Sequence, residues 1–142
     1  MGMMSMQLKV AVAAVIRGVG NRILLIQRGH APESGRWAVP GGHVESGEGY
    51  ETALCREVWE ETSLEVEVGP LLYVSELQNG PERLLILDFG IEHVYSTNAG
   101  RALSDAKSLG YFSESEWQDL NLAQGMTGLL TDARVRRFLA WA

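Results

Sequence analysis

The stretch that most constrains this chain runs from residue 42 to residue 64. It follows Pro40-Gly41 and starts at Gly42, a combination typical of a tight turn or of close contact with a ligand. The next residues repeat with helical periodicity, so that apolar positions share one arc and acidic positions fill the adjoining arc of about 100°. The apolar set is Leu54, Cys55, Val58 and Thr62, and the acidic set is Glu57, Glu60 and Glu61. The stretch predicts a loop that leads into one amphipathic helix.

The acidic face of this helix needs a physical cause. Carboxylates three or four positions apart each cost an isolated helix about 0.2–0.5 kcal/mol. Arg56 can pair with Glu60, but one guanidinium cannot neutralise three carboxylates. Either the face is an ordinary solvated surface, or it binds a hard divalent cation such as Mg²⁺, which prefers oxygen ligands. The helix alone leaves both interpretations open.

The spacing of the loop and the helix favours the cation. Written out from Gly42, the pattern is G-x5-E-x7-R-E-V-x-E-E-x-S-L. It closely resembles the signature of the Nudix hydrolases, G-x5-E-x7-R-E-U-x-E-E-x-G-U, in which U is aliphatic. The one departure is Ser63, which stands where the family has glycine. A serine there is strained in a left-handed cap, so we expect the end of the helix to be rearranged.

The resemblance implies a metal site on the helix. Glu57 and Glu61 are the expected ligands, Glu60 is expected as a ligand or as a neighbour of one, and the backbone carbonyl of Gly41 is expected to join them. Mg²⁺ is the expected ion, with Mn²⁺ as a substitute. Arg56 is expected to hold a carboxylate in place by a charge-assisted hydrogen bond.

The resemblance also implies catalytic and substrate-binding roles. The expected catalytic residues are Glu57, Glu60 and Arg56. Glu57 is our hypothesis for the general base, and Glu60 or an acid on a distant loop is the alternative. The expected substrate-binding residues are Arg28, Gly42 and Glu48. Arg28 is more typical of a solvated strand end than of a substrate contact, and Glu48 could instead have an orienting role or reach a second metal.

One acidic position of the family has no clear counterpart. Many relatives carry an acid shortly before the closing aromatic strand. In this chain such an acid is either missing or supplied by Asp105, Glu82 or Glu114.

The function that the resemblance implies is hydrolysis of a pyrophosphate bond. We expect a metal-dependent pyrophosphohydrolase for a nucleoside triphosphate, or for a nucleoside diphosphate linked to another group, such as ADP-ribose. The alternative is a weak or inactive Nudix-like module that binds a nucleotide without cleaving it. A third hypothesis, a protein-interaction domain that uses the acidic helix, predicts no metal binding. The sequence does not identify the nucleotide.

Composition and charge narrow the partners. A chain of 142 residues suits one domain, residues 1–142. A net charge of −6 disfavours binding to a nucleic acid polymer, which requires clustered Lys and Arg. A single cysteine excludes a disulfide within the chain, and residues 1–6 lack the basic segment of a signal peptide. We therefore expect a cytoplasmic protein without membrane association, and the resemblance favours a homodimer.

The order of predicted elements defines the fold class. We expect an α/β protein, a Nudix-type α/β/α sandwich with a central mixed β-sheet. The first two strands should pair as a hairpin, and Asp88 should point outward or be capped. The expected strands are residues 8–16, 22–27, 64–68, 71–77, 83–94 and 109–112, with a turn at 79–81, and the expected helices are the acidic helix, 114–120 and 127–141.

Overall fold

The structure is a computed structural model that describes residues 7–141, apart from the side chain of Asn79. The prediction that no signal peptide is present concerns residues 1–6 and lies outside the described residues. Among the described residues, no helix is long and apolar enough to cross a membrane. The cytoplasmic location stays a prediction.

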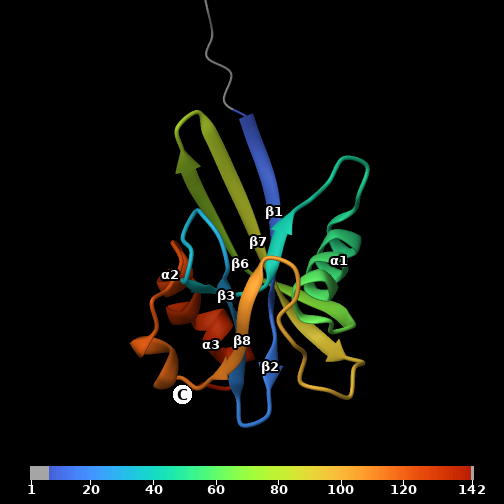
Figure 1. The fold of residues 1–142 in the computed structure, drawn as a ribbon, viewed down its shortest axis with the longest axis vertical. Helices are drawn as coiled ribbons and strands as arrows, with labels where there is room; N and C mark the ends of the chain where they lie inside the picture. The colour runs from blue at the N-terminus through green and yellow to red at the C-terminus, as the bar shows by residue number, and fades with distance from the viewer. Residues whose placement is uncertain (1–6, 142) are drawn as a thin grey trace, which may run out of the picture.

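Within the described part of the chain, eight strands and four helical segments follow one another; Figure 1 shows their arrangement. The strands are β1 (Gln7–Val15), β2 (Arg17–Gly18), β3 (Arg22–Arg28), β4 (Trp37–Ala38), β5 (Gly41–His43), β6 (Val66–Asn79), β7 (Glu82–Val94) and β8 (Ala106–Phe112). The helices are α1 (Tyr50–Thr62), the 3₁₀-helix η1 (Glu116–Asp119), α2 (Met126–Thr131) and α3 (Ala133–Phe138).

The strands form two sheets of four. The first has the order β5-β1-β7-β6, in which β1 and β7 are parallel and the other pairs are antiparallel. In the second, β3 pairs with β2, β4 and β8. The first sheet is therefore mixed, as predicted, and β7 occupies an interior position between β1 and β6.

Helices cover both sides of the strands. Alternate residues of β1 face opposite ways, so that Val12 and Ala14 pack toward α1 while Ala13 and Val15 pack toward α2 and α3. Leu24 and Leu25 of β3 divide in the same way. In Figure 1, α1 lies on one side of the strands and α2 with α3 on the other. The α/β/α arrangement with a central mixed sheet is confirmed.

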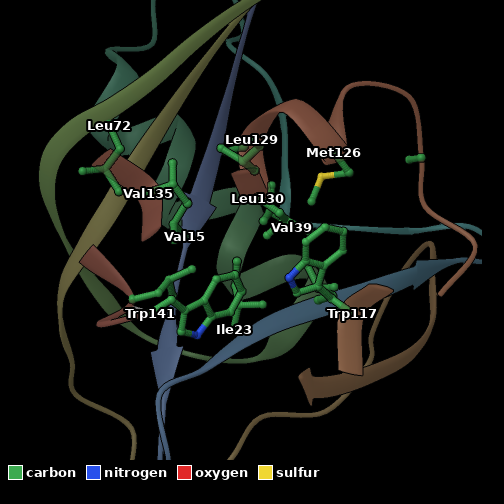
Figure 2. Close-up of a cluster of buried hydrophobic side chains, with 14 residues drawn as sticks. Val15, Ile23, Val39, Leu72, Trp117, Met126, Leu129, Leu130, Val135 and Trp141 are labelled. Carbon is green, nitrogen blue, oxygen red and sulfur yellow. The ribbon is translucent and has the colours of Figure 1, made fainter. Parts of the chain in front are cut away.

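The apolar cluster on the α2 and α3 side is dense (Figure 2). Val15 and Ile23 from the strands contact a group that includes Leu130, Val135 and Trp141. All of these side chains are buried, the first four of them completely. The C-terminal segment is therefore part of the core, and it also forms a wall of the cavity described below.

Two expected strand arrangements are wrong. β3 does not pair with β1, because both edges of β1 are occupied by β5 and β7; the hairpin forms instead between β2 and β3. The segments expected as two strands, 64–68 and 71–77, form the single strand β6. Register shifts between Glu67 and Tyr73 let this one strand bend while it keeps its pairing with β7.

The expected C-terminal helix is divided in two. Asp132 has extended backbone angles, and its carboxylate accepts the N–H groups of Arg134 and Val135 at 3.0 and 3.2 Å. This side chain caps α3 and ends the continuity with α2. The capping box at Ser113 and Glu116 is present as predicted, but it precedes one turn of 3₁₀-helix rather than a longer helix.

Ser63 does occupy the left-handed position. Its φ is 62° and its ψ 15°, and its N–H donates to the carbonyl of Trp59 at 2.9 Å. The expectation of a rearranged helix end is wrong: the serine adopts the backbone that a family glycine would adopt, in spite of the steric cost.

Candidate active site

The two glycines before α1 permit close packing rather than an unusual backbone. Gly41 pairs with Ala13 of β1, and a side chain at Gly41 would overlap the carbonyl oxygen of Val12. A side chain at Gly42 would overlap the carboxyl group of Glu57. Neither glycine has a positive φ. Their role is to let β5 and α1 approach until the Glu57 carboxylate touches the loop backbone.

Arg56 ties the loop to the helix. Its Nε and Nη2 donate to the two carboxylate oxygens of Glu48 at 2.7 and 2.9 Å, and its Nη1 donates to Glu57 Oε1 at 2.8 Å. Nη2 also donates to the carbonyl of His43 at 3.2 Å, and Glu60 lies 3.4 Å from Nη1. The pKa of Glu48 is lowered to about 2. The hydrogen bond from Arg56 is the largest cause, and the hydrogen bond from the Glu45 N–H is the second. Arg56 therefore orients several motif carboxylates, the role that the resemblance implied.

Glu61 and Glu57 are the two motif carboxylates that line the cavity described below. Glu61 Oε1 accepts the N–H of Gly41 at 2.8 Å. Burial is the main cause that raises the pKa of Glu61 to about 7, and repulsion from Glu57 adds to it. Burial also raises the pKa of Glu57, opposed by its bond to Arg56. Two adjacent carboxylates whose negative charge is poorly solvated favour a cation between them.

A cavity of about 560 Å³ opens beside these carboxylates. Of the residues predicted for the site, Glu57, Glu61, Gly41, Gly42 and Arg28 line it. The other three predicted residues, Arg56, Glu48 and Glu60, lie outside it. Arg56 bonds the lining carboxylate of Glu57, and Glu48 in turn binds Arg56. Glu60 remains largely exposed, with 47% of the side chain accessible. Their individual roles stay predictions.

The mouth of the cavity carries both signs of charge. Arg28 lies there, and its positive charge lowers the pKa of Glu61. His30 Nε2 lies 3.2 Å from a carboxylate oxygen of Asp105, and both residues line the cavity. The pKa of His30 is raised. The hydrogen bond to the carbonyl of Ala31 is the main cause, and the carboxylate of Asp105 is the next.

Asp105 is the distal acid that the structure brings to the cavity. Of the other two candidates, Glu82 pairs with Lys9 at 3.3 Å and Glu114 pairs with Arg136. Neither of these two carboxylates lines the cavity. Of the three candidates, Asp105 is therefore the one that lines the cavity, and its charge helps to raise the pKa of Glu61.

The interior of the cavity is mainly apolar, and the carboxyl group of Asp88 and the hydroxyl group of Ser75 are the polar side-chain groups that the first sheet adds to it. Its walls are side chains of the first sheet and of the segment around α2: Ala11, Ala13, Leu84, Ile86, Ala123, Met126 and Leu129. Asp88 of β7 lies among them and is 3% exposed. The expectation that Asp88 points outward or is capped is wrong, because β7 directs alternate side chains into the cavity and Asp88 follows Leu84 and Ile86 in that series.

The chemistry of these donors fits a hard divalent cation. Glu57, Glu61 and Asp105 offer carboxylate oxygens, and Gly41 offers a backbone carbonyl. Within residues 7–141, no three acidic, histidine or cysteine side chains converge closely enough to form a complete metal site on their own. Mg²⁺ in particular is held by one or two carboxylates, with waters and substrate phosphates completing its shell. The open arrangement agrees with that mode of binding.

A family comparison identifies the class of protein to which this α/β/α fold and carboxylate-lined cavity belong. Residues 7–141 match the family model of the NUDIX domain, so the chain belongs to the Nudix hydrolase family. The resemblance inferred from the motif is confirmed. A crystal structure of a MutT NUDIX hydrolase from Burkholderia pseudomallei is 30% identical, with a TM-score of 0.79, and the match covers 89% of this chain and 98% of that one.

Two named relatives match over shorter stretches. An ADP-ribose pyrophosphatase from Methanocaldococcus jannaschii is 49% identical over 46% of this chain and 38% of its own length. A putative 8-oxo-dGTP diphosphatase 2 from Mycobacterium tuberculosis is 47% identical over 40% of this chain and 40% of its own length. Each match therefore spans well under half of the relative, and the relatives' substrates do not transfer with the fold.

Several lining residues carried no sequence signal. Asp88 sits inside an apolar run, His30 has no partner at metal-ligand spacing, and Met126 and Leu129 resemble ordinary core residues. They converge only because β7, the loop after β3 and α2 meet at one cavity. The alternation of β7 is the one signal that could have placed Asp88 on the same face as Leu84 and Ile86.

Proposed function

We propose that this chain is a metal-dependent pyrophosphohydrolase. Its substrate is a nucleoside triphosphate or a nucleoside diphosphate linked to another group, such as ADP-ribose. The observation that carries the proposal is one cavity that joins the carboxylates of Glu57 and Glu61 to an apolar interior. The acidic end suits a cation with a polyphosphate, and the apolar end suits the ring of a nucleoside. The names of the two relatives above support this chemistry.

Glu57, Glu61 and the carbonyl oxygen of Gly41 are the groups we propose to hold Mg²⁺, with Glu60 as a further ligand and Mn²⁺ as a substitute. Divalent metal ions are generally used in this family. When bound, the ion supplies charge neutralisation for the pyrophosphate and acidifies water. The raised pKa of Glu61 supports this assignment, because a carboxylate that is poorly solvated gains most from a cation.

The side chains around the cation position the reacting groups. Arg28 at the mouth is placed to bind a phosphate oxygen and to orient the substrate. Arg56 fixes Glu57 by its bond to Oε1 and leaves Oε2 without a bond to the guanidinium. Oε2 is therefore the atom we propose to accept the proton of the attacking water, while the pyrophosphate oxygen leaves with the other half of the substrate.

The test is hydrolysis of a nucleotide panel with and without Mg²⁺, with products identified by mass. The panel contains the common nucleoside triphosphates, 8-oxo-dGTP and ADP-ribose. We expect release of a nucleoside monophosphate that depends on the metal, and a Glu57→Gln variant about 100-fold or more slower. Glu51→Gln, on the same helix but exposed and outside the cavity, is the matched control. Normal turnover by Glu57→Gln would remove Glu57 from the role of base.

A nucleotide sensor without hydrolysis is the second candidate. It predicts that the same nucleotides bind but that no product appears with any metal. The retention of Glu57, Glu60 and Glu61 argues against it, since a module that only binds needs no complete acidic set. An interaction domain that uses α1 as an acidic surface predicts no metal binding at all.

We further propose that residues 1–142 form one domain that acts on small nucleotides rather than on nucleic acid polymers. The family match over residues 7–141 and the net charge of −6 support this. A homodimer and a cytoplasmic location are also proposals, and sedimentation of the purified protein tests the first.

A further inference from the structure

Asp88 is a buried carboxyl group without a partner. It lies on β7 between Ala13 of β1 and Tyr73 of β6, and it is 3% exposed. Within the described residues, no hydrogen bond or ion pair reaches its side chain. The hydroxyl of the neighbouring Tyr73 lies instead against Gly128 of α2. Burying a carboxyl group unpaired is costly, so its retention calls for a partner that enters from the cavity.

The surroundings of Asp88 describe what that partner can be. The walls beside it are apolar, with Ile86 on its own strand and Met126 and Leu129 on the opposite side. Mainly apolar walls with a small number of polar groups are typical of a pocket for a ring that carries a polar edge. Burial, the only cause identified, raises the pKa of Asp88 to about 7. An ionised carboxyl group only accepts hydrogen bonds, so an exocyclic amino group, which donates, suits it better than an oxo group, which only accepts.

The position of Asp88 relative to the acidic loop fits a bound nucleoside. In the first sheet, Gly41, Ala13 and Asp88 form one row across three adjacent strands. Adjacent strands lie about 4.8 Å apart, so Asp88 is roughly 10 Å from the glycine beside the carboxylates. A nucleoside phosphate whose phosphate lies at the loop would place the far edge of its base near Asp88.

We propose that Asp88 is a specificity-determining residue that binds the amino-bearing edge of a nucleobase through hydrogen bonds from the base to its carboxyl group. The ligand class is a nucleotide of adenine or cytosine, whose exocyclic amino group stands where hypoxanthine or uracil carries an oxo group. This rests on the proposed function for the substrate class, but its binding test does not require hydrolysis.

The experiment compares bases that differ only in the replacement of an amino group by an oxo group. Hydrolysis of ATP against ITP and of CTP against UTP is measured for the wild-type chain, Asp88→Asn and Asp88→Leu. We expect at least one pair to differ by about 10-fold or more in kcat/KM in the wild type, and that ratio to fall toward 1 in Asp88→Leu. Asp88→Asn, which is nearly isosteric and both donates and accepts, should weaken the preference while keeping the fold. Asp119→Asn, exposed on η1, is the control.

Binding of the nucleosides adenosine, inosine, cytidine and uridine is measured in parallel by NMR, without metal. If the wild type hydrolyses nothing but its binding preference for an amino-bearing base is lost in the Asp88 variants, the proposed function fails and the inference stands. If hydrolysis occurs but each pair is treated within about 2-fold, or the variants keep the wild-type ratio, the inference is overturned. In that case the carboxyl group is satisfied by water alone.

Discussion

At the scale of single residues, Gly42 fixes where the Glu57 carboxylate can lie. We predict that Gly42→Ala lowers kcat/KM and metal affinity by about 10- to 100-fold, because the new methyl group would overlap the Glu57 carboxyl and push it away from the cavity. Isothermal titration with Mn²⁺ and steady-state kinetics measure the two effects.

Gly49→Ala is the matched control for this prediction. Gly49 precedes α1, has an ordinary φ of −76°, and has open space where a methyl group would be added. Its substitution should leave metal affinity and turnover near the wild-type values. Equal behaviour of the two variants would contradict the role assigned to Gly42.

At the scale of elements, the bond between Arg56 and Glu48 joins the loop to α1. The pKa of Glu48 is lowered to about 2, mainly by its bond to Arg56, so the folded protein binds this proton less tightly than the unfolded chain does. The stabilisation is present above the ordinary pKa of a glutamate and is lost as the pH falls toward 2. We predict that thermal midpoints of the wild type fall more steeply than those of Glu48→Gln between pH 5 and 2.5.

Glu116→Gln is not a neutral control for that measurement, since the pKa of Glu116 is also lowered, by the Ser113 N–H. Glu76→Gln, on an exposed position of β6, is suitable. Parallel curves for the wild type and Glu48→Gln would show that the link between loop and helix does not contribute to acid stability.

The end of α1 gives a second prediction at this scale. Ser63 holds a left-handed backbone that glycine adopts without strain. We predict that Ser63→Gly stabilises the fold by about 1 kcal/mol, measured by urea denaturation. Ser46→Gly, at an exposed loop position without positive φ, should be neutral or destabilising. A loss of stability in Ser63→Gly would mean that the serine side chain contributes more than the backbone costs.

At the scale of the whole molecule, both sides of the fold depend on the same strands. β1 and β3 contribute to the cluster under α1 and to the cluster under α2 and α3. The cavity lies where the acidic loop and α2 meet this shared layer, so a ligand that bridges them should stabilise the molecule as one unit. We predict that Mg²⁺ with a non-hydrolysable nucleotide raises the thermal midpoint, by about 2.7 kcal/mol of stability at a ligand concentration 100 times Kd.

Differential scanning calorimetry measures this effect, with a chelator as the reference condition. The Glu61→Gln variant should lose most of the metal-dependent shift, because Glu61 is the most buried of the motif carboxylates that line the cavity. A shift in wild type that is insensitive to both the chelator and this substitution would place the metal elsewhere.

The sequence by itself determined the family, the mixed α/β class, α1 and the set of motif carboxylates. These features depend on local spacing: one helix brings Glu57 and Glu61 together, and Arg56 reaches Glu48 and Glu60 across one or two turns. Helical periodicity and a short loop therefore suffice to predict them.

Only the tertiary structure decided which strands pair, which acids outside α1 line the cavity, and which side chains line its apolar end. Hydrophobic patterns cannot settle which strands pair with β1. β3 is far more apolar than β5, which is Gly-Gly-His, and yet β5 occupies one edge of β1 and β7 the other. Asp105 and Asp88 are distant from the motif in sequence and reach the cavity through packing. Long-range packing therefore placed the residues that we expect to choose the substrate, while local periodicity placed those that we expect to bind its metal.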